Sequence, residues 1–152
     1  MKKLLALCLT LLCLPLFAGC SLQGIAQAYD FALETLSAMG LRVDQTLLGK
    51  REQGADGITG TYQAAYEGFA GKEVIFANAS LDGMTGRKIT IRCDLRIQSG
   101  HARLMLKTGT EPARVLCESN SRYRETLVLP DAANYIWVEG EDWTGSIDLE
   151  VS

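Results

Sequence analysis

Histidine is nearly absent from this chain of 152 residues, and basic residues do not outnumber acidic ones. The single histidine, His101, cannot supply the histidine pair of an HExxH zinc motif, and the chain has no GxSxG nucleophile elbow. The net charge is −3, whereas phosphate binding needs clustered Lys and Arg. These absences argue against a common hydrolase site and against nucleic acid as a partner.

The chain also lacks an apolar run of the roughly 20 residues that a helix needs to cross a bilayer. Its longest such run covers residues 4–17 and follows the positive pair Lys2 and Lys3. A positive start, a short apolar run and small residues after it are typical of a secretory signal peptide. We therefore expect residues 1–19 to be a signal peptide that is removed.

The end of this signal, Phe17-Ala18-Gly19-Cys20, resembles the lipobox of bacterial lipoproteins of the Gram-positive type. The resemblance implies cleavage before Cys20, a diacylglycerol on its sulfur, and a protein held at the extracytoplasmic face of the cell membrane. Two acyl chains anchor a protein stably, where one binds only marginally. The membrane is thus an expected partner through Cys20. The alternative is an ordinary signal peptide in which Cys20 falls by chance.

Cysteine is scarce in the rest of the chain. Of five cysteines, two lie in the expected signal and one is Cys20, so that Cys93 and Cys117 remain. In an oxidising compartment these two would form a disulfide that closes a loop of about 24 residues and contributes about 3 kcal/mol. The alternative is a pair of buried free thiols that pack as small apolar residues. No CxxC or Cys/His cluster accompanies them, and we expect no metal site and no cofactor.

Loss of residues 1–19 would leave 133 residues, enough for one domain with a sizeable core. Loss of Lys2 and Lys3 leaves 13 of 15 basic residues against 18 acidic ones, a net charge of −5. Residues 20–40 predict a helix or stalk, because apolar residues recur at steps of three and four: Leu22, Ile25, Tyr29, Ala32, Leu36 and Met39. Residues 41–60 are rich in glycine and predict a linker.

Residues 61–152 predict a β domain. Over 88–98, Ile89, Ile91, Cys93, Leu95 and Ile97 alternate with polar residues, as in a strand with one buried face. Ser99-Gly100 predicts a hairpin turn into the next strand. About eight short strands with turn signals between them predict a mainly β fold, an antiparallel β-sandwich preceded by one short helix.

Two further resemblances concern the mature chain. The segment 129–138, followed by Gly145-Ser146-Ile147-Asp148-Leu149, resembles the sandwich domains at the C-terminus of bacterial prepeptidases. The order of lipobox, short helix and a β domain opened by Gly60-Thr61-Tyr62 resembles small lipoproteins of Gram-positive bacteria. Neither resemblance implies a particular activity.

Aromatic residues offer the strongest candidates for binding. In 135–138 we expect Ile136 and Val138 to face the core, which places Tyr135 and Trp137 together on the opposite face, with Trp143 in the following turn. Flat rings beside polar groups are a common way to hold a sugar. Tyr62 and Tyr66 form a similar pair on the first strand of the β domain. The alternative is that the N-terminal helix packs over such a face and buries the rings.

We therefore expect a non-catalytic binding module for a glycan or an envelope component, with Tyr135, Trp137 and Trp143 as its candidate ligand-binding residues. The alternative is a structural or accessory lipoprotein that contacts another envelope protein. A less favoured alternative is a hydrolase that uses two carboxylates such as Glu141 and Asp142. Asp148 and Glu150 alternate with apolar residues in the last strand and are expected on a solvated face.

Overall fold

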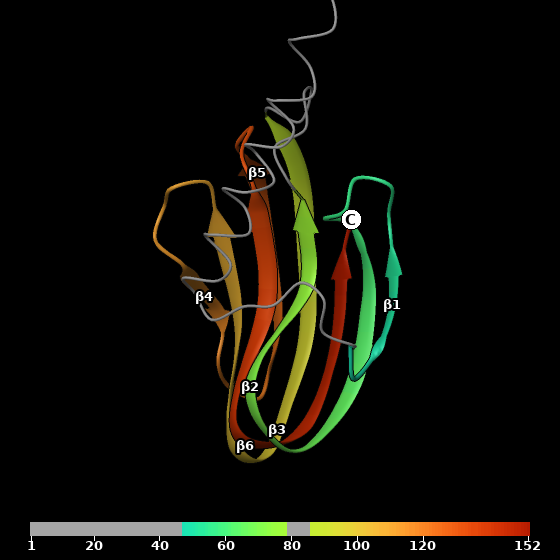
Figure 1. Ribbon diagram of the computed structural model, residues 1–152, viewed down its shortest axis with the longest axis vertical. Coiled ribbons are helices and arrows are strands. Elements are labelled where there is room, and N and C mark those ends of the chain that lie inside the picture. The colour runs from blue at the N-terminus through green and yellow to red at the C-terminus, as the bar shows by residue number, and fades with distance from the viewer. Residues whose placement is uncertain (1–46, 79–85) are drawn as a thin grey trace, which may run out of the picture.

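A computed structural model describes residues 47–78 and 86–152 of this chain (Figure 1). The predicted signal peptide, Cys20, the predicted helix and the start of the predicted linker lie outside the described residues. Six strands make up the described part: β1 (Lys50–Gln53), β2 (Gly60–Asn78), β3 (Arg87–Thr108), β4 (Arg114–Cys117), β5 (Ser121–Leu129) and β6 (Asn134–Val151). Within these ranges no helix is long and apolar enough to cross a membrane.

The six strands form one antiparallel sheet in the order β1-β2-β6-β3-β4, and β5 also pairs with β3. Strand β6 lies at the centre, where it pairs with β2 from Gly60↔Val151 to Asn78↔Asn134 and with β3 from Ile91↔Val151 to Thr108↔Asn134. The centre of the sheet is therefore made by the last strand together with the two longest earlier ones.

The three long strands bend sharply at one end of the molecule, the lower end in Figure 1. Their pairing slips there, between Tyr66 and Phe69 on β2 and between Ile97 and Ser99 on β3, as it does at β-bulges. Gly100 has a φ of 74° at this bend, and a side chain on it would meet the carbonyl oxygen of Asp142 at 2.2 Å. Only glycine fits that position without strain.

The bend divides the sheet into two halves that face each other. Half A holds β1, β5 and residues 60–66, 87–97 and 145–151; half B holds β4 and residues 69–78, 99–108 and 134–143. The main core lies between the halves and takes side chains from both, such as Tyr62 and Leu149 from half A and Phe76 and Leu104 from half B. Shortening one of these side chains to Ala typically costs 2–5 kcal/mol.

The mainly β, antiparallel class predicted from the sequence is confirmed, and so is the buried face of 88–98, where Ile89, Ile91, Cys93 and Leu95 point into the core. The predicted hairpin at Ser99-Gly100 is wrong, because these residues form a bulge within one continuous strand. The strands number six in the described part, since neighbouring predicted strands merge through the bend. The two layers expected of a sandwich are thus halves of one sheet.

The segment predicted as a linker also carries structure. Residues 50–53 form β1, which pairs with the start of β2. The loop that follows is held by Asp56, whose carboxylate accepts hydrogen bonds from the amides of Ile58 and Thr59 and lies 2.6 Å from Arg87. This side chain fixes the turn between β1 and β2 as a defined part of the fold.

Candidate functional site

The outer face of half A, which points away from the core, carries rows of polar side chains across its strands. The pairing register places Arg122, Asp94, Asp148 and Gln63 side by side, from β5 through β3 and β6 to β2. In the next row toward the bend, the same register places Arg96 beside Ser146 and Ser146 beside Ala65. The first row therefore consists of long or charged side chains, whereas the second row has only the small side chains of Ser146 and Ala65 on β6 and β2.

Asp94 is the most heavily contacted group of these rows. Arg96 approaches both of its carboxylate oxygens, with Nε 2.6 Å from Oδ1 and Nη2 donating to Oδ2 at 3.0 Å, and Arg122 Nε donates to Oδ2 at 3.2 Å. The hydrogen bond from Arg96, with further help from Arg122, holds the pKa of Asp94 below its ordinary value. Asp94 is therefore an ionised acceptor of hydrogen bonds from two guanidinium groups.

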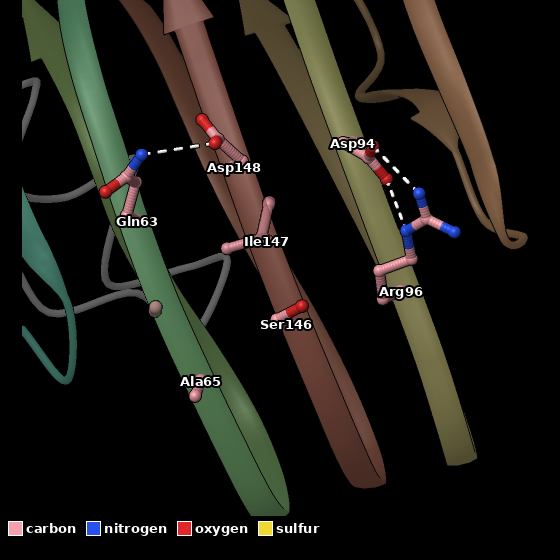
Figure 2. Close-up of a pocket in the computed structure, with 8 residues that line it drawn as sticks. Gln63, Ala65, Asp94, Arg96, Ser146, Ile147 and Asp148 are labelled. Carbon is pink, nitrogen blue, oxygen red and sulfur yellow. Dashed lines mark hydrogen bonds and ion pairs between the residues drawn. The ribbon is translucent and has the colours of Figure 1, made fainter.

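Asp148 lies directly across from Asp94 on the neighbouring strand, and Gln63 Nε2 donates to its Oδ2 at 3.1 Å (Figure 2). Beside this pair the surface is hollowed where Ala65 and Ser146 leave room, and the hollow measures about 540 Å³. Its rim carries Asp148, Gln63 and Arg96, as Figure 2 shows. A second hollow of about 320 Å³ continues the face toward β5 and shares Asp94 and Asp148 with the first.

The polar groups around the hollow can bind a ligand through hydrogen bonds without reacting with it. Carboxylates accept hydrogen bonds, guanidinium groups donate them, and the amide of Gln63 and the hydroxyl of Ser146 do both. Acids and arginines are mixed on the rim, so the hollow suits a ligand that offers many hydroxyl or amide groups and little net charge. Side chains on paired strands are also held more firmly than side chains on loops.

Tyr135 and Trp137, the first two predicted binding residues, share one face of β6, while Ile136 and Val138 point into the core as predicted. That face is the outer side of half B, where the two rings pack with Val74 and Met105. Both rings are buried, and Trp137 is only 1% exposed. They offer no open platform in this structure, so that sugar stacking on them stays a prediction.

A polar frame surrounds the Trp137 ring. Its Nε1 donates to Glu139 Oε1 at 2.9 Å, and Glu139 also pairs with Lys72 at 3.2 Å and with Arg103 at 3.0 Å. Burial raises the pKa of Glu139, but the hydrogen bonds from Trp137 and Lys72 outweigh it and leave the pKa below its ordinary value. The hydroxyl of Tyr135 is buried and has no hydrogen-bond partner among the described residues.

Trp143, the third predicted residue, lies within β6 and inside the core, not in a turn. Its ring is fully buried, stacks on Tyr66 with centroids 4.1 Å apart, and donates from Nε1 to the carbonyl of Arg96 at 3.1 Å. The paired Tyr62 and Tyr66 share a face as predicted, but that face is the core. These three rings stabilise the fold near the bend.

Cys93 and Cys117 are buried free thiols whose sulfurs lie 3.9 Å apart.

Glu141 and Asp142, the carboxylates considered for hydrolysis, are exposed at the bend, where Glu141 lies 4.0 Å from Arg103. Within residues 47–78 and 86–152, no group of three or more His, Cys, Asp and Glu side chains is placed to hold a metal ion.

The polar hollow was not predicted from the sequence. Asp148 was correctly expected on a solvated face, but nothing in one strand shows which residues of other strands stand beside it. The available signal was the small pair, Ala65 and Ser146, at outward positions where neighbouring strands carry long polar side chains. It becomes informative only once the register is known, because the register decides which side chains share a row.

No protein-family model and no curated protein matches this chain. Among solved structures, one named BiXyn10A CBM1 APO is similar at 9% identity with a TM-score of 0.32, over 71% of this chain and 89% of that one. The structure of infectious bursal disease virus Gx strain is similar at 11% identity with a TM-score of 0.29, over 71% of this chain and 33% of that one. Likenesses this distant carry no argument about function, which rests on the residues themselves.

Proposed function

We propose that this protein is a lipid-anchored, extracytoplasmic binding module that holds a glycan, or another envelope component rich in hydroxyl groups, in the polar hollow on the outer face of half A. The observation that carries the proposal is the hollow of about 540 Å³ between Ala65 and Ser146, with Gln63, Arg96 and Asp148 on its rim. The anchor is the lipid expected on Cys20.

The arrangement favours binding over catalysis in two ways. Asp94 is occupied by two arginines, and an ionised, ion-paired carboxylate is a poor general acid. Donors and acceptors stand in fixed positions around a shallow floor, which is how polar groups set the orientation of a bound ligand. A ligand hydroxyl near Asp148 would find an acceptor, and one near Arg96 would find a donor.

A titration of the soluble chain from Ser21 onward with fragments of cell-wall polysaccharides tests the proposal. Binding is measured by calorimetry and by NMR shifts of the residues around the hollow. Ala65→Leu fills the floor and is expected to weaken binding at least tenfold, because a tenfold loss takes only about 1.4 kcal/mol. Ala70→Leu is the matched control, since Ala70 is exposed on the same strand but lies outside the hollow.

Loss of affinity in both variants, or in neither, would contradict the assignment of the hollow. If no fragment binds to the folded wild-type protein, the glycan proposal fails as a whole. That result would favour the alternative function, an accessory lipoprotein with a protein partner. The exposed Val128 on edge strand β5 offers a contact for such a partner.

A further inference from the structure

Cys93 and Cys117 are 24 positions apart in the sequence but meet across the core, with 3.9 Å between their sulfurs. Cys93 lies on β3 in half A, where it pairs with Leu149 and Tyr123. Cys117 ends β4 and pairs with Leu104 in half B. The fold thus brings two thiols from opposite halves to one point, and both are buried and free.

We propose that Cys93 and Cys117 are the site of an intramolecular disulfide, formed once the chain reaches the oxidising compartment that its signal peptide predicts. The disulfide fastens edge strand β4 to half A. The proposal rests on the export part of the proposed function and is independent of the ligand. A disulfide sets its sulfurs about 2 Å apart, so that closure brings the two sulfurs about 2 Å nearer to each other than they are here.

Strand β4 is the element that gains most from such a link. It has four residues and pairs only with β3, over Leu104–Leu106, with a register shift after Leu104. Outside the core, Arg114 on β4 donates two hydrogen bonds to Glu125 on β5 in half A. Nη1 donates to Oε1 at 3.1 Å, and Nη2 donates to Oε2 at 3.0 Å. Because edge strands with few partners open easily, a covalent link there removes a route of local unfolding.

Thiol–disulfide exchange with a small disulfide such as oxidised glutathione supplies the oxidant. The Cys117 thiolate attacks one sulfur of the glutathione disulfide, forms a mixed disulfide and releases one glutathione thiolate. The Cys93 thiolate then attacks the Cys117 sulfur and releases the second glutathione. Two protons leave the protein thiols, one protein S–S bond forms, and the two electrons reduce the glutathione disulfide to two thiols.

The order of attack follows from the environment of the pair. The neighbouring Cys117 sulfur, together with burial, raises the pKa of the Cys93 thiol, which makes Cys93 the poorer first nucleophile. Cys117 also lies on the edge strand β4, and local opening of this strand would expose its thiol to a reagent in solution. Cys117 is therefore expected to be the first thiol attacked and Cys93 the resolving one.

The test uses the full mature chain with Cys20 replaced by Ser, reduced and then incubated with oxidised glutathione. Intact mass is expected to fall by two hydrogen atoms, with no thiol left for alkylation and a Tm higher by roughly 10 °C than that of the reduced form. A chain that keeps two alkylatable thiols, or that links only to a second copy, overturns the proposal.

Single variants separate the two roles. Cys93→Ser is expected to stop at a stable glutathione adduct on Cys117, and Cys117→Ser is expected to react at least tenfold more slowly. Equal rates overturn the order of attack. The same alkylation assay on the full-length chain made in a bacterial host tests the compartment: a disulfide in the oxidised purified chain and free thiols in the chain taken from the cells would overturn the export part alone, since neither measurement involves a ligand.

Discussion

The carboxylate of Glu73, in half B, accepts a hydrogen bond at 2.8 Å from the hydroxyl of Tyr62, which faces it from half A. Tyr66 donates to the same oxygen, and the amide of Leu48 donates to the other one at 2.6 Å. Glu73 is almost fully buried. One acid thus ties both halves of the sheet and the segment before β1 together, on the side of the core opposite the cysteine pair.

Replacing Glu73 by Ala is expected to lower the free energy of unfolding by about 3 kcal/mol. The substitution leaves two buried hydroxyls and an amide without their acceptor, and each unsatisfied group typically costs 1–3 kcal/mol, in part relieved by water. Urea unfolding followed by circular dichroism measures the loss. Glu67→Ala, at an exposed position of the same strand, is the matched control and should change stability by less than about 0.5 kcal/mol. A similar stability for both variants would show that the contact at Glu73 contributes little.

Acid is expected to weaken the turn between β1 and β2. Burial raises the pKa of Asp56, but hydrogen bonds from Thr59 and Ile58 and the charge of Arg87 outweigh it, so the pKa lies below its ordinary value of 3.8. Because the folded state holds this carboxyl in its charged form, the stabilisation is present above about pH 4 and is lost as the pH falls through the lowered pKa.

Thermal unfolding between pH 6 and pH 2 measures this effect. The loss of Tm on acidification is expected to be smaller in Asp56→Asn than in the wild type, since the variant has no charge to lose at this position. Glu118→Gln, exposed in the turn between β4 and β5, serves as the control. An identical pH profile for Asp56→Asn and the wild type would refute the assignment.

The two tryptophans are expected to respond differently to removal of the N-terminal segment. Both are buried, so that the intact chain should emit at short wavelength. Trp137 lies on the outer face of half B, and no described strand passes over that face. The apolar stripe predicted between Leu22 and Met39 is the segment of this chain suited to cover Trp137. A chain that begins at residue 46 should therefore expose Trp137 to acrylamide and shift its emission to longer wavelength.

The same truncation in a Trp137→Phe background leaves only Trp143, which is locked against Tyr66 in the core and should be unaffected. Unchanged quenching of Trp137 in a truncated, folded chain would mean that residues 46–152 bury this ring by themselves. Exposure of both rings would mean that the truncation unfolds the sheet, which circular dichroism would show.

Lipidation of Cys20 is tested in cells. An alkyne fatty acid fed to a bacterial host should label the wild-type protein and leave it in the membrane fraction, because two acyl chains hold a protein there stably. Cys20→Ala should be unlabelled and released. Cys93→Ala is the matched control, since it removes a cysteine of the folded domain and should keep the label. Membrane retention of an unlabelled Cys20→Ala protein would argue for another anchor.

The faces of single strands could be predicted from the sequence, because side chains alternate with a fixed period of two. This is why Ile91 and Leu95 were correctly placed in the core, and why Tyr135 and Trp137 were correctly placed together. The bend could not be predicted in this way. Gly100 gives the same signal for a tight turn and for a bulge, and only the partner strands decide between them.

The candidate site needed information that no single strand contains. Asp94 and Asp148 are 54 positions apart and become neighbours only through the register of β3 on β6. The burial of Trp137 was left open for a related reason, since a ring on the outer face is exposed or covered according to what lies above the sheet. Contacts between distant segments therefore limit what the sequence alone can show about this protein.

The central position of β6 has a consequence for how the protein folds. Strands β2 and β3 each pair with β6 along most of their length, and β6 is synthesised after both of them, so that the pairing that joins them forms last. Contacts such as Gly60↔Val151 give a high contact order, which typically makes folding slow. The two sides of the sheet, β1–β2 and β3–β4–β5, are therefore joined into one core only when the last strand of the chain is in place.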